Sequence, residues 1–254
     1  MDASDDDADL VRLRTLHGRS TIAWVGDGLH RVTETHWLAL SGAPHADYNL
    51  ALCHGPEGGE ALGACIDTIT ARRRPAIIAL GGETKNHTDP LTQACWVPVG
   101  SAPLMTVGTA AGRTDAAVRP LAGDELGAAQ ELVAGTFGLP PDIAKVALTT
   151  APDRVPGRTV WGLFCDEALV SCLTAVAIDD AIVIWSMATS ASERRRGYGA
   201  RLLGGALAGA RESGARTCLL HASQAGERLY LAAGFHVAER WDFWSRRRWV
   251  LPSG

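Results

Sequence analysis

Three consecutive runs of apolar residues occupy the second half of the chain. They are TVWGLFCD (159–166), ALVSCLTAVAID (168–179) and AIVIWSMAT (181–189), each rich in residues that favour strands. Only short polar breaks separate the three runs. The pattern therefore predicts three strands joined as antiparallel hairpins.

Helical spacing of apolar residues precedes and follows these strands. It predicts helices over 124–139, over 140–150, from just after Gly199 to about Ser213, and over 225–234. Further strands are predicted at 117–121, 216–223 and 235–250. The predicted order is a strand, two helices, three strands, a helix, a strand, a helix and one or two closing strands.

The first half of the chain repeats the end of this order. The predicted elements are strand 47–55, helix 58–74, strand 75–82, helix 89–96 and strand 97–107. Within them, LTQACWVPV (91–99) has the pattern of YLAAGFHVA (230–238), in which an aromatic residue joins an apolar helix end to a strand. We interpret this as a duplication whose first copy is truncated at its front. A change of composition near residues 110–116 divides the chain into lobes 1–112 and 113–254.

Composition narrows the class of protein. The chain has 254 residues, 46% of them hydrophobic, and a net charge of −4, so we expect a globular protein without a nucleic-acid partner. The acidic start MDASDDDADL predicts a solvated terminus rather than a signal peptide, and no apolar run is long enough for a membrane span. The six cysteines form no CxxC pair, so we expect free, mostly buried thiols, a cytoplasmic location and no metal site.

The stretch SERRRGYGARL (192–202) carries the clearest candidate chemistry. It lies between a predicted strand and a predicted helix, where unpaired N–H groups and the positive end of the helix dipole attract anions. Gly197 and Gly199 permit close backbone approach, and the neighbouring arginines suit phosphate oxygens. The stretch lacks the Lys-Ser/Thr pair of a P-loop and comes too late in the chain for a dinucleotide fingerprint. The alternative to an anion-binding loop is a basic helix start that is simply exposed to solvent.

The order of the surrounding strands and helices narrows the type of anion-binding loop that this stretch can be. Arg194-x-x-Gly197-x-Gly199-Ala200 resembles the R/Q-x-x-G-x-G/A motif of the GNAT superfamily of acetyl-CoA-dependent N-acetyltransferases. WSMATSASE (185–193) is similar to the family's central strand, and GERLYLAAGFHVAER (226–240) to its closing motif. The resemblance extends from about residue 116 to 250. It implies an α/β (α+β) fold with a mixed, mostly antiparallel central sheet flanked by helices, and a second, degenerate GNAT-like lobe before it.

The resemblance also implies roles for individual residues. Acetyl-CoA would be the co-substrate, with its pyrophosphate held by backbone amides of the arginine-glycine loop and its pantetheine arm paired along the central strand. Tyr230 would be the general acid that protonates the departing thiolate. The residues implied for CoA binding are Met187, Ala188, Thr189, Arg194, Arg195, Arg196, Gly197, Tyr198, Gly199, Ala200 and Ser223.

The general base and the acceptor stay open at this stage. The central strand carries no glutamate, which leaves Asp179, Asp180, His221 or water as the base. We expect an amine acceptor, either a small molecule or a peptide, attacked by direct transfer in a ternary complex. The alternative is a noncatalytic acyl-CoA-binding or interaction protein. The first lobe is expected to be noncatalytic, because Glu57 and Glu60 stand at its phosphate position and Leu91 at its tyrosine position.

Overall fold

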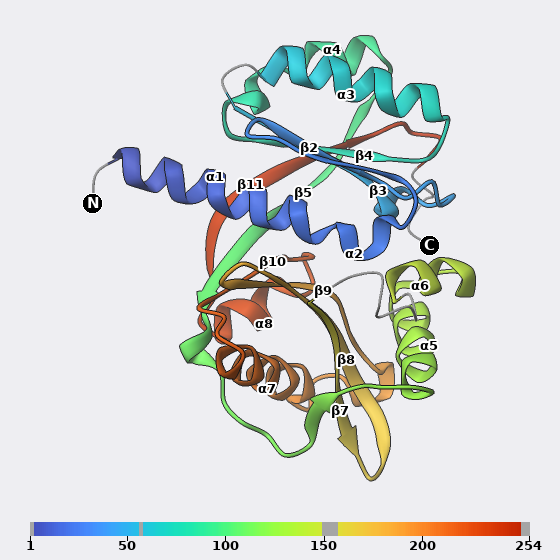
Figure 1. Ribbon diagram of the computed structural model, residues 1–254. Coiled ribbons are helices and arrows are strands. Elements are labelled where there is room, and N and C mark those ends of the chain that lie inside the picture. Colours follow the sequence, from blue (N-terminus) through green and yellow to red (C-terminus); the bar gives the residue numbers. More distant parts are fainter. Residues whose placement is uncertain (1–2, 56–57, 149–156, 250–254) are drawn as a thin grey trace. The chain divides into compact units, whose positions relative to one another are not determined.

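The computed structural model describes residues 3–55, 58–148 and 157–249 (Figure 1). It divides into two compact units. Unit 1 consists of Met1–Pro103 together with Ala238–Gly254, and unit 2 consists of Leu104–Val237. The end of the chain therefore belongs to the unit that contains its beginning. The composition change at 110–116 lies inside unit 2, a few residues after the first strand of that unit.

Unit 2 contains the strand and helix order expected from the sequence. Its strands are β6 (Val118–Pro120), β7 (Arg158–Cys165), β8 (Ala168–Ile178), β9 (Ala181–Thr189) and β10 (Thr217–His221), joined by the end of β5 (Val97–Gly108). Its helices are α5 (Glu125–Phe137), α6 (Pro141–Ala147), α7 (Tyr198–Glu212) and α8 (Glu227–Ala232). The predicted hairpins of β7, β8 and β9 are confirmed.

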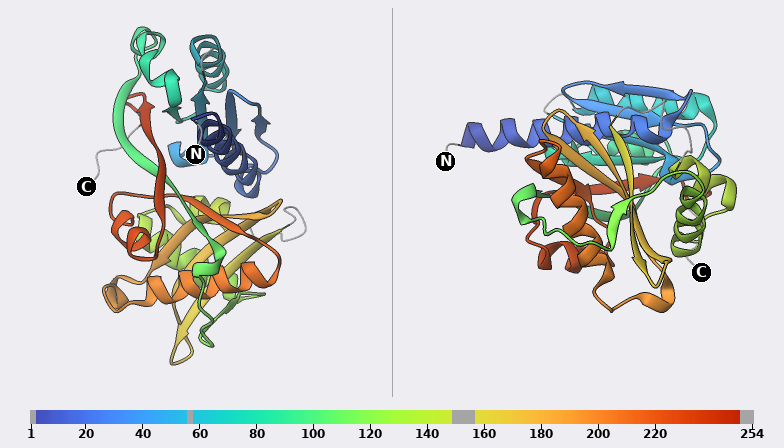
Figure 2. Two further views of the ribbon diagram at one scale, coloured as in Figure 1. Left: turned by 90° about the vertical axis from the view of Figure 1, so that its left-hand side faces the viewer. Right: turned by 60° about the horizontal axis from the view of Figure 1, so that its bottom comes forward.

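The sheet of unit 2 has the order β5-β10-β9-β8-β7-β6. Its neighbours are antiparallel except β9 and β10, which are parallel. The sheet separates α7 from α5, so helices cover both of its faces (Figures 1 and 2). The mixed, mostly antiparallel sheet flanked by helices confirms the expected fold class. The buried face of α7 supplies Leu203, Ala206, Leu207 and Ala210 to the core, in the spacing that predicted the helix.

Unit 1 begins with two helices and two strands that the sequence patterns did not predict, α1 (Ala3–Ser20), α2 (Ile22–Val25), β1 (Leu29–Val32) and β2 (His36–Leu40). Its other helices are α3 (Gly58–Arg72) and α4 (Asp89–Gln93). Its other strands are β3 (Asn49–His54) and β4 (Ile77–Gly81), with β11 (His236–Ser245) completing the order β1-β2-β3-β4-β11. The segment expected to be a solvated N-terminus is helical from Ala3 onward, and Ala8 and Asp9 within it are exposed.

The two halves of the chain are repeats over more of their length than the sequence indicated. Both contain two helices, three strands, a helix, a strand, a helix and a strand, and the first lacks only a counterpart of β6. The backbone confirms the alignment of Leu91 with Tyr230. The N–H of Trp96 donates to the carbonyl of Leu91 at 2.9 Å, and the N–H of Phe235 donates to that of Tyr230 at 3.0 Å. Cys95 and Gly234, at the matching turns, both have positive φ.

The final strand of each repeat pairs with the penultimate strand of the other repeat. β5 ends the first repeat and pairs antiparallel with β10, where Leu220 lies opposite Met105. β11 ends the second repeat and pairs antiparallel with β4, where Trp244 lies opposite Ile78. Each compact unit is therefore completed by a strand from the other repeat.

Candidate functional site

Two adjacent strands of unit 2 stop pairing part-way along their length. β9 and β10 are in parallel register from Ala181 opposite Thr217 to Ile184 opposite Leu220. β9 continues for another five residues, to Thr189, while β10 ends one residue later, at His221. The C-terminal half of β9 thus offers its backbone beyond the point where its register with β10 ends, which is the kind of edge that an extended ligand can join.

A β-bulge lies at the same point of β9. Cys172 of β8 is opposite Ala188 and Thr174 is opposite Trp185, so β9 has one residue more than β8 across this interval. Ser186 takes the extra length with φ = 51°, a backbone conformation that is uncommon for a non-glycine residue. Sequence reasoning missed Ser186, because a bulge in a continuous apolar run leaves no signal in the pattern.

The arginine-glycine loop connects this edge to α7. Gly197 is the N-cap residue of α7 with φ = 85°, and Arg195 also has a positive φ of 67°. The first bond of the helix runs from the N–H of Arg201 to the carbonyl of Gly197 at 3.1 Å. The N–H groups of the first turn, from Gly197 to Ala200, consequently have no partner within the helix and add to the positive end of its dipole.

The side chains of the loop have different surroundings. Arg194 donates to the carbonyl of Thr189 at 3.3 Å, and Arg196 forms an ion pair with Glu193 at 2.7 Å. The ring of Tyr198 is buried in the core of unit 2, and its hydroxyl lies 3.5 Å from the thiol of Cys165. The side chain of Tyr198 is therefore part of the core.

Arg195 lines a hollow of about 600 Å³ beside the start of α8, together with Gln224, Ala225, Glu227, Arg228 and Leu231. The expected residue Ser223 comes just before this lining. Its hydroxyl accepts a hydrogen bond from the N–H of Gly226 at 3.2 Å. The observed contact of Ser223 thus stabilises the turn into α8.

Tyr230 approaches β9 from α8. Its side chain is 8% exposed, and its hydroxyl lies 3.5 Å from the sulfur of Met187, next to the bulge. Burial, followed by the nearby Cys218, raises the pKa of Tyr230 above the usual value for a phenol. A Cβ placed on Gly199 would lie 3.3 Å from Leu229 and 3.4 Å from Met187. The hydroxyl of Tyr230, the bulged strand and the first turn of α7 thus converge on one place.

The three candidate bases are not equivalent in position. Asp179 and Asp180 form the turn between β8 and β9, where the carbonyl of Asp180 accepts from the N–H of Arg216 at 2.7 Å. This turn lies at the start of β9, the end opposite the bulge. His221 is the last residue of β10 and directly follows the final pair with β9. Of the three, only His221 lies where the strands diverge.

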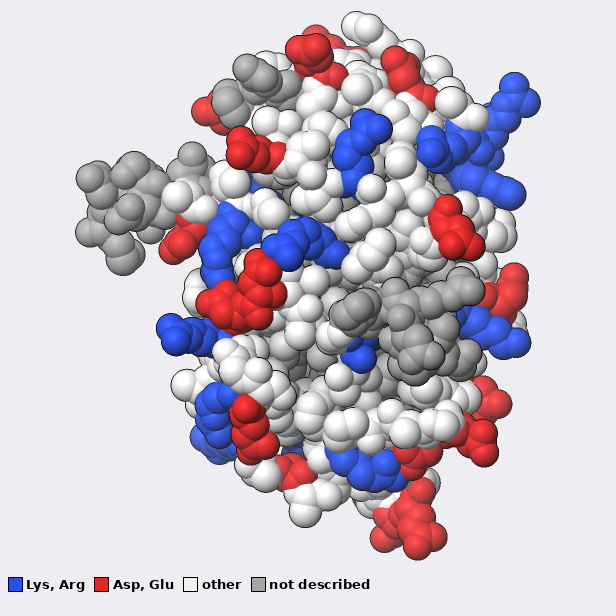
Figure 3. Space-filling view, in the orientation of Figure 1, with Lys and Arg blue, Asp and Glu red and all other residues white. Residues whose placement is uncertain are grey.

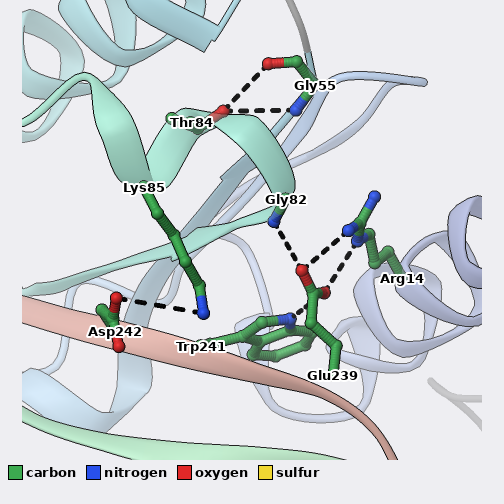
Figure 4. A network of polar contacts seen from close by, with 8 residues as sticks. All are labelled: Arg14, Gly55, Gly82, Thr84, Lys85, Glu239, Trp241 and Asp242. Atoms are coloured by element: carbon green, nitrogen blue, oxygen red, sulfur yellow. Dashed lines mark hydrogen bonds and ion pairs between the residues drawn. The ribbon is translucent and has the colours of Figure 1, made fainter.

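The corresponding strands of unit 1 remain paired to their ends. β3 and β4 are in register from Leu50 opposite Ile77 to His54 opposite Gly81. Beyond them, the hydroxyl of Thr84 lies 3.2 Å from both the N–H and the carbonyl oxygen of Gly55 (Figure 4). The ends that diverge in unit 2 are therefore tied together in unit 1.

A carboxylate occupies the end of β4 in unit 1. Glu239 of β11 accepts a hydrogen bond from the N–H of Gly82, two from Arg14 at 2.7 and 2.8 Å, and one from the indole of Trp241 at 2.7 Å (Figure 4). Leu91, at the tyrosine position, is fully buried. Glu60 lies in the first turn of α3, whereas Glu57 lies outside the described residues.

Comparison with known proteins identifies the type of domain. Residues 130–235, which contain the loop, the diverging strands and Tyr230, match the sequence model of the acetyltransferase (GNAT) family. These residues form a GNAT acetyltransferase domain. No curated protein matches the chain.

Solved GNAT structures share the fold over both repeats. A GCN5-related N-acetyltransferase from Kribbella flavida is 18% identical, with a TM-score of 0.69 and 96% of each chain covered. One from Sphaerobacter thermophilus is 17% identical, with a TM-score of 0.58, covering 94% of this chain and 92% of its own. A tandem GNAT protein from the clavulanic acid biosynthesis pathway is 12% identical, with a TM-score of 0.54, and covers 96% and 95%.

Two kinds of feature are absent from the described residues. No helix within them has the length and apolar character needed to cross a membrane. No group of three or more His, Cys, Asp or Glu side chains among them is arranged to hold a metal ion.

Proposed function

We propose that the GNAT domain of unit 2 transfers an acetyl group from acetyl-CoA to an amine. The observation that carries the proposal is the divergence of β9 from β10 after Ile184, beside the first turn of α7 and the hydroxyl of Tyr230. An extended pantetheine arm fits the unpaired part of β9, a pyrophosphate fits the first turn of α7, and a departing thiolate fits the hydroxyl of Tyr230.

CoA would be held mainly by backbone groups. The N–H groups of Arg195 to Ala200 would bind the pyrophosphate, because those from Gly197 to Ala200 have no helical partner and those of Arg195 and Arg196 directly precede them. Met187, Ala188 and Thr189 would pair with the pantetheine arm as a strand pairs with its neighbour. Arg194, Arg195 and Arg196 would add positive charge, with Arg195 in the hollow beside α8.

The reaction would be a direct attack. The amine nitrogen forms a bond to the thioester carbonyl carbon, the carbon–sulfur bond breaks, and the sulfur leaves with its electron pair. Tyr230 donates a hydrogen bond to that sulfur and then its proton, and the nitrogen loses a proton to His221 or to water. A phenol is protonated at neutral pH at its usual pKa. Burial raises the pKa of Tyr230 further, so its hydroxyl enters the reaction as a hydrogen-bond donor but gives up its proton less readily. The hydroxyl already lies beside one sulfur, that of Met187.

One observation supports the alternative function, a noncatalytic protein that binds acyl-CoA. β9 carries no carboxylate, and the nearest acidic pair along the chain lies at the wrong end of the strand. A domain that binds acyl-CoA without turnover would have the same loop and the same diverging strands. The two functions differ in one measurable step, which is the release of CoA.

We also propose a role for unit 1 and a compartment for the protein. Unit 1 would be noncatalytic, because the ends of β3 and β4 are tied together and Leu91 replaces the tyrosine. All six cysteines are free, which supports a reducing compartment such as the cytoplasm. Four of them are buried as expected, but Cys95 is exposed and Cys165 is partly exposed.

The test combines binding with turnover. Calorimetry with acetyl-CoA measures binding, and a thiol reagent measures the release of CoA with a panel of small-molecule amines and peptides. Binding together with amine-dependent release supports an acetyltransferase. Binding without release for any amine supports the noncatalytic alternative, and the absence of binding contradicts both.

A further inference from the structure

Two segments of three arginines meet on unit 1. Arg72 is the last residue of α3 and is followed directly by Arg73 and Arg74, and Arg246–Arg248 follow β11. The two segments lie at the same end of the β4–β11 pair, because Ser245 is opposite Ile77 and its hydroxyl donates to the carbonyl of Ala76 at 2.7 Å. Arg246 also donates to the hydroxyl of Thr70 in α3 at 3.0 Å. Figure 3 shows the blue side chains gathered at this end of α3. We call these six residues the arginine face.

The arginine face is not neutralised by its own surroundings. Arg72, Arg73, Arg74, Arg247 and Arg248 are exposed and Arg246 is half-buried. Within the described part of the chain, none of the six forms an ion pair. The dipole of α3 explains only Arg72, which lies in its last turn. Arg73 has already left the helix, with φ = 53°.

Aromatic side chains hold part of this face in place. The guanidinium group of Arg246 lies 5.1 Å from the ring centre of Trp249 and 5.8 Å from that of Trp96, and Arg248 lies 5.5 Å from Trp249. The two tryptophan rings pack edge to face at 5.4 Å. Stacking of this kind restricts the arginine side chains and leaves their N–H groups available for carboxylate or phosphate oxygens.

The charge of the rest of the chain favours a short acidic ligand over a long polyanion. The six arginines contribute +6 to a net charge of −4, so all other residues together carry −10. A nucleic acid longer than the arginine face would meet this negative surplus and be repelled. A short acidic segment would need to reach only the face itself.

The chain contains such a segment at its own beginning. Residues 1–9 include five aspartates and no basic residue. The start of α1 lies on the side of unit 1 away from the end of α3 (Figure 1), so within one copy the segment and the arginine face are apart. We propose that the arginine face binds the acidic N-terminal segment of a second copy of the chain.

The first experiment uses the segment as a labelled peptide. Fluorescence anisotropy measures binding of MDASDDDADL to the full chain, with MNASNNNANL as the uncharged control. We expect binding at about 20 mM salt that weakens strongly near 500 mM, because exposed charges are screened. The variant Arg247→Glu/Arg248→Glu should bind the peptide about tenfold more weakly or worse. The matched control Arg211→Glu/Arg216→Glu changes the same charge at two exposed arginines of unit 2 and should bind normally.

The second experiment tests the full chain by sedimentation. The natural chain should self-associate at low salt, and both Arg247→Glu/Arg248→Glu and Asp5→Lys/Asp6→Lys/Asp7→Lys should associate less. Mixing the two variants should restore association, since each then supplies what the other lacks.

Three results would overturn the proposal. They are equal binding of the charged and uncharged peptides, association that is unchanged in both variants, and tighter binding of a single-stranded RNA of about ten nucleotides to the face without self-association. Circular dichroism confirms that the variants are folded, and Arg247→Gln/Arg248→Gln repeats the test without introducing new carboxylates. None of these results depends on acetyltransferase activity.

Discussion

Replacement of Gly197 by valine tests whether the first turn of α7 holds the CoA pyrophosphate. Gly197 has φ = 85°, and a Cβ added there would meet nothing within 4 Å, so the substitution acts through the backbone alone. Holding a non-glycine residue in this region costs about 1–2 kcal/mol, and more for a β-branched residue. The loop is expected to relax away from this conformation and to turn its N–H groups away from the ligand.

The size of the effect follows from those N–H groups. A hydrogen bond to a charged ligand contributes about 1.5–3 kcal/mol. Misalignment of one such bond weakens acetyl-CoA binding by roughly 10- to 100-fold, and misalignment of two by the product. Calorimetry on the folded variant measures this loss directly.

Gly214 supplies the matched control. It follows the other end of α7, has φ = 92°, and also has nothing within 4 Å of an added Cβ. Gly214→Val should destabilise the domain by a similar amount without changing the affinity for acetyl-CoA. Natural affinity in a folded Gly197→Val protein, or an equal loss in both variants, would refute the assignment of the pyrophosphate to this loop.

Four other results are expected. Tyr230→Phe should lower kcat by about 100-fold with little loss of acetyl-CoA affinity, measured where chemistry limits the rate; turnover at the natural rate would contradict the acid role. Titration should give one CoA per chain, and two would contradict a noncatalytic unit 1. Glu239→Gln should cost about 3–5 kcal/mol in denaturant unfolding, because it leaves Arg14 buried without its carboxylate; a loss below 1 kcal/mol would show that the pair is dispensable. Burial, and then the charge of Arg14, lowers the pKa of His54 to about 4. As pH falls, the unfolded chain therefore binds a proton at His54 before the folded chain does, and the free energy of unfolding of unit 1 should fall by up to about 3 kcal/mol between about pH 6.5 and 4. A free energy of unfolding that does not change over that range would contradict this expectation.

Local patterns predicted the parts of the fold that local chemistry determines. The hairpins of β7 to β9 followed from their strand-forming runs, and α7 from the spacing of Leu203, Ala206 and Leu207. The alignment of Leu91 with Tyr230 was visible in sequence and is repeated in the backbone hydrogen bonds. The candidate site was predictable as far as its loop and its tyrosine, because glycine, arginine and tyrosine occur there in a recognisable order.

The parts that the sequence did not predict depend on distant partners. β5 and β11 have similar patterns, so nothing local determines that β5 pairs with β10 and β11 with β4. The aspartates in the first turns of α1 are consistent with a solvated terminus and equally with the start of a helix. The bulge at Ser186 appears only when β9 is placed against β8. In each case one segment has two acceptable conformations, and tertiary packing selects between them.

The exchange of final strands explains why the two repeats could diverge at one position. Glu239 lies on β11, so the residue that fills the end of β4 in unit 1 comes from the second repeat. Although burial alone raises its pKa, hydrogen bonds from Arg14, Gly82 and Trp241 lower the pKa of Glu239 overall, and the carboxylate is held charged in unit 1. By the alignment of Leu91 with Tyr230, the matching position of the first repeat is Gly100 of β5, a strand that pairs with β10 only from Leu104 onward. There no carboxylate is placed at the end of the strand, and the register of β9 and β10 ends early. A substitution in either final strand thus acts on the other repeat, so unit 1 could close around Glu239 while the diverging strands of unit 2 were preserved.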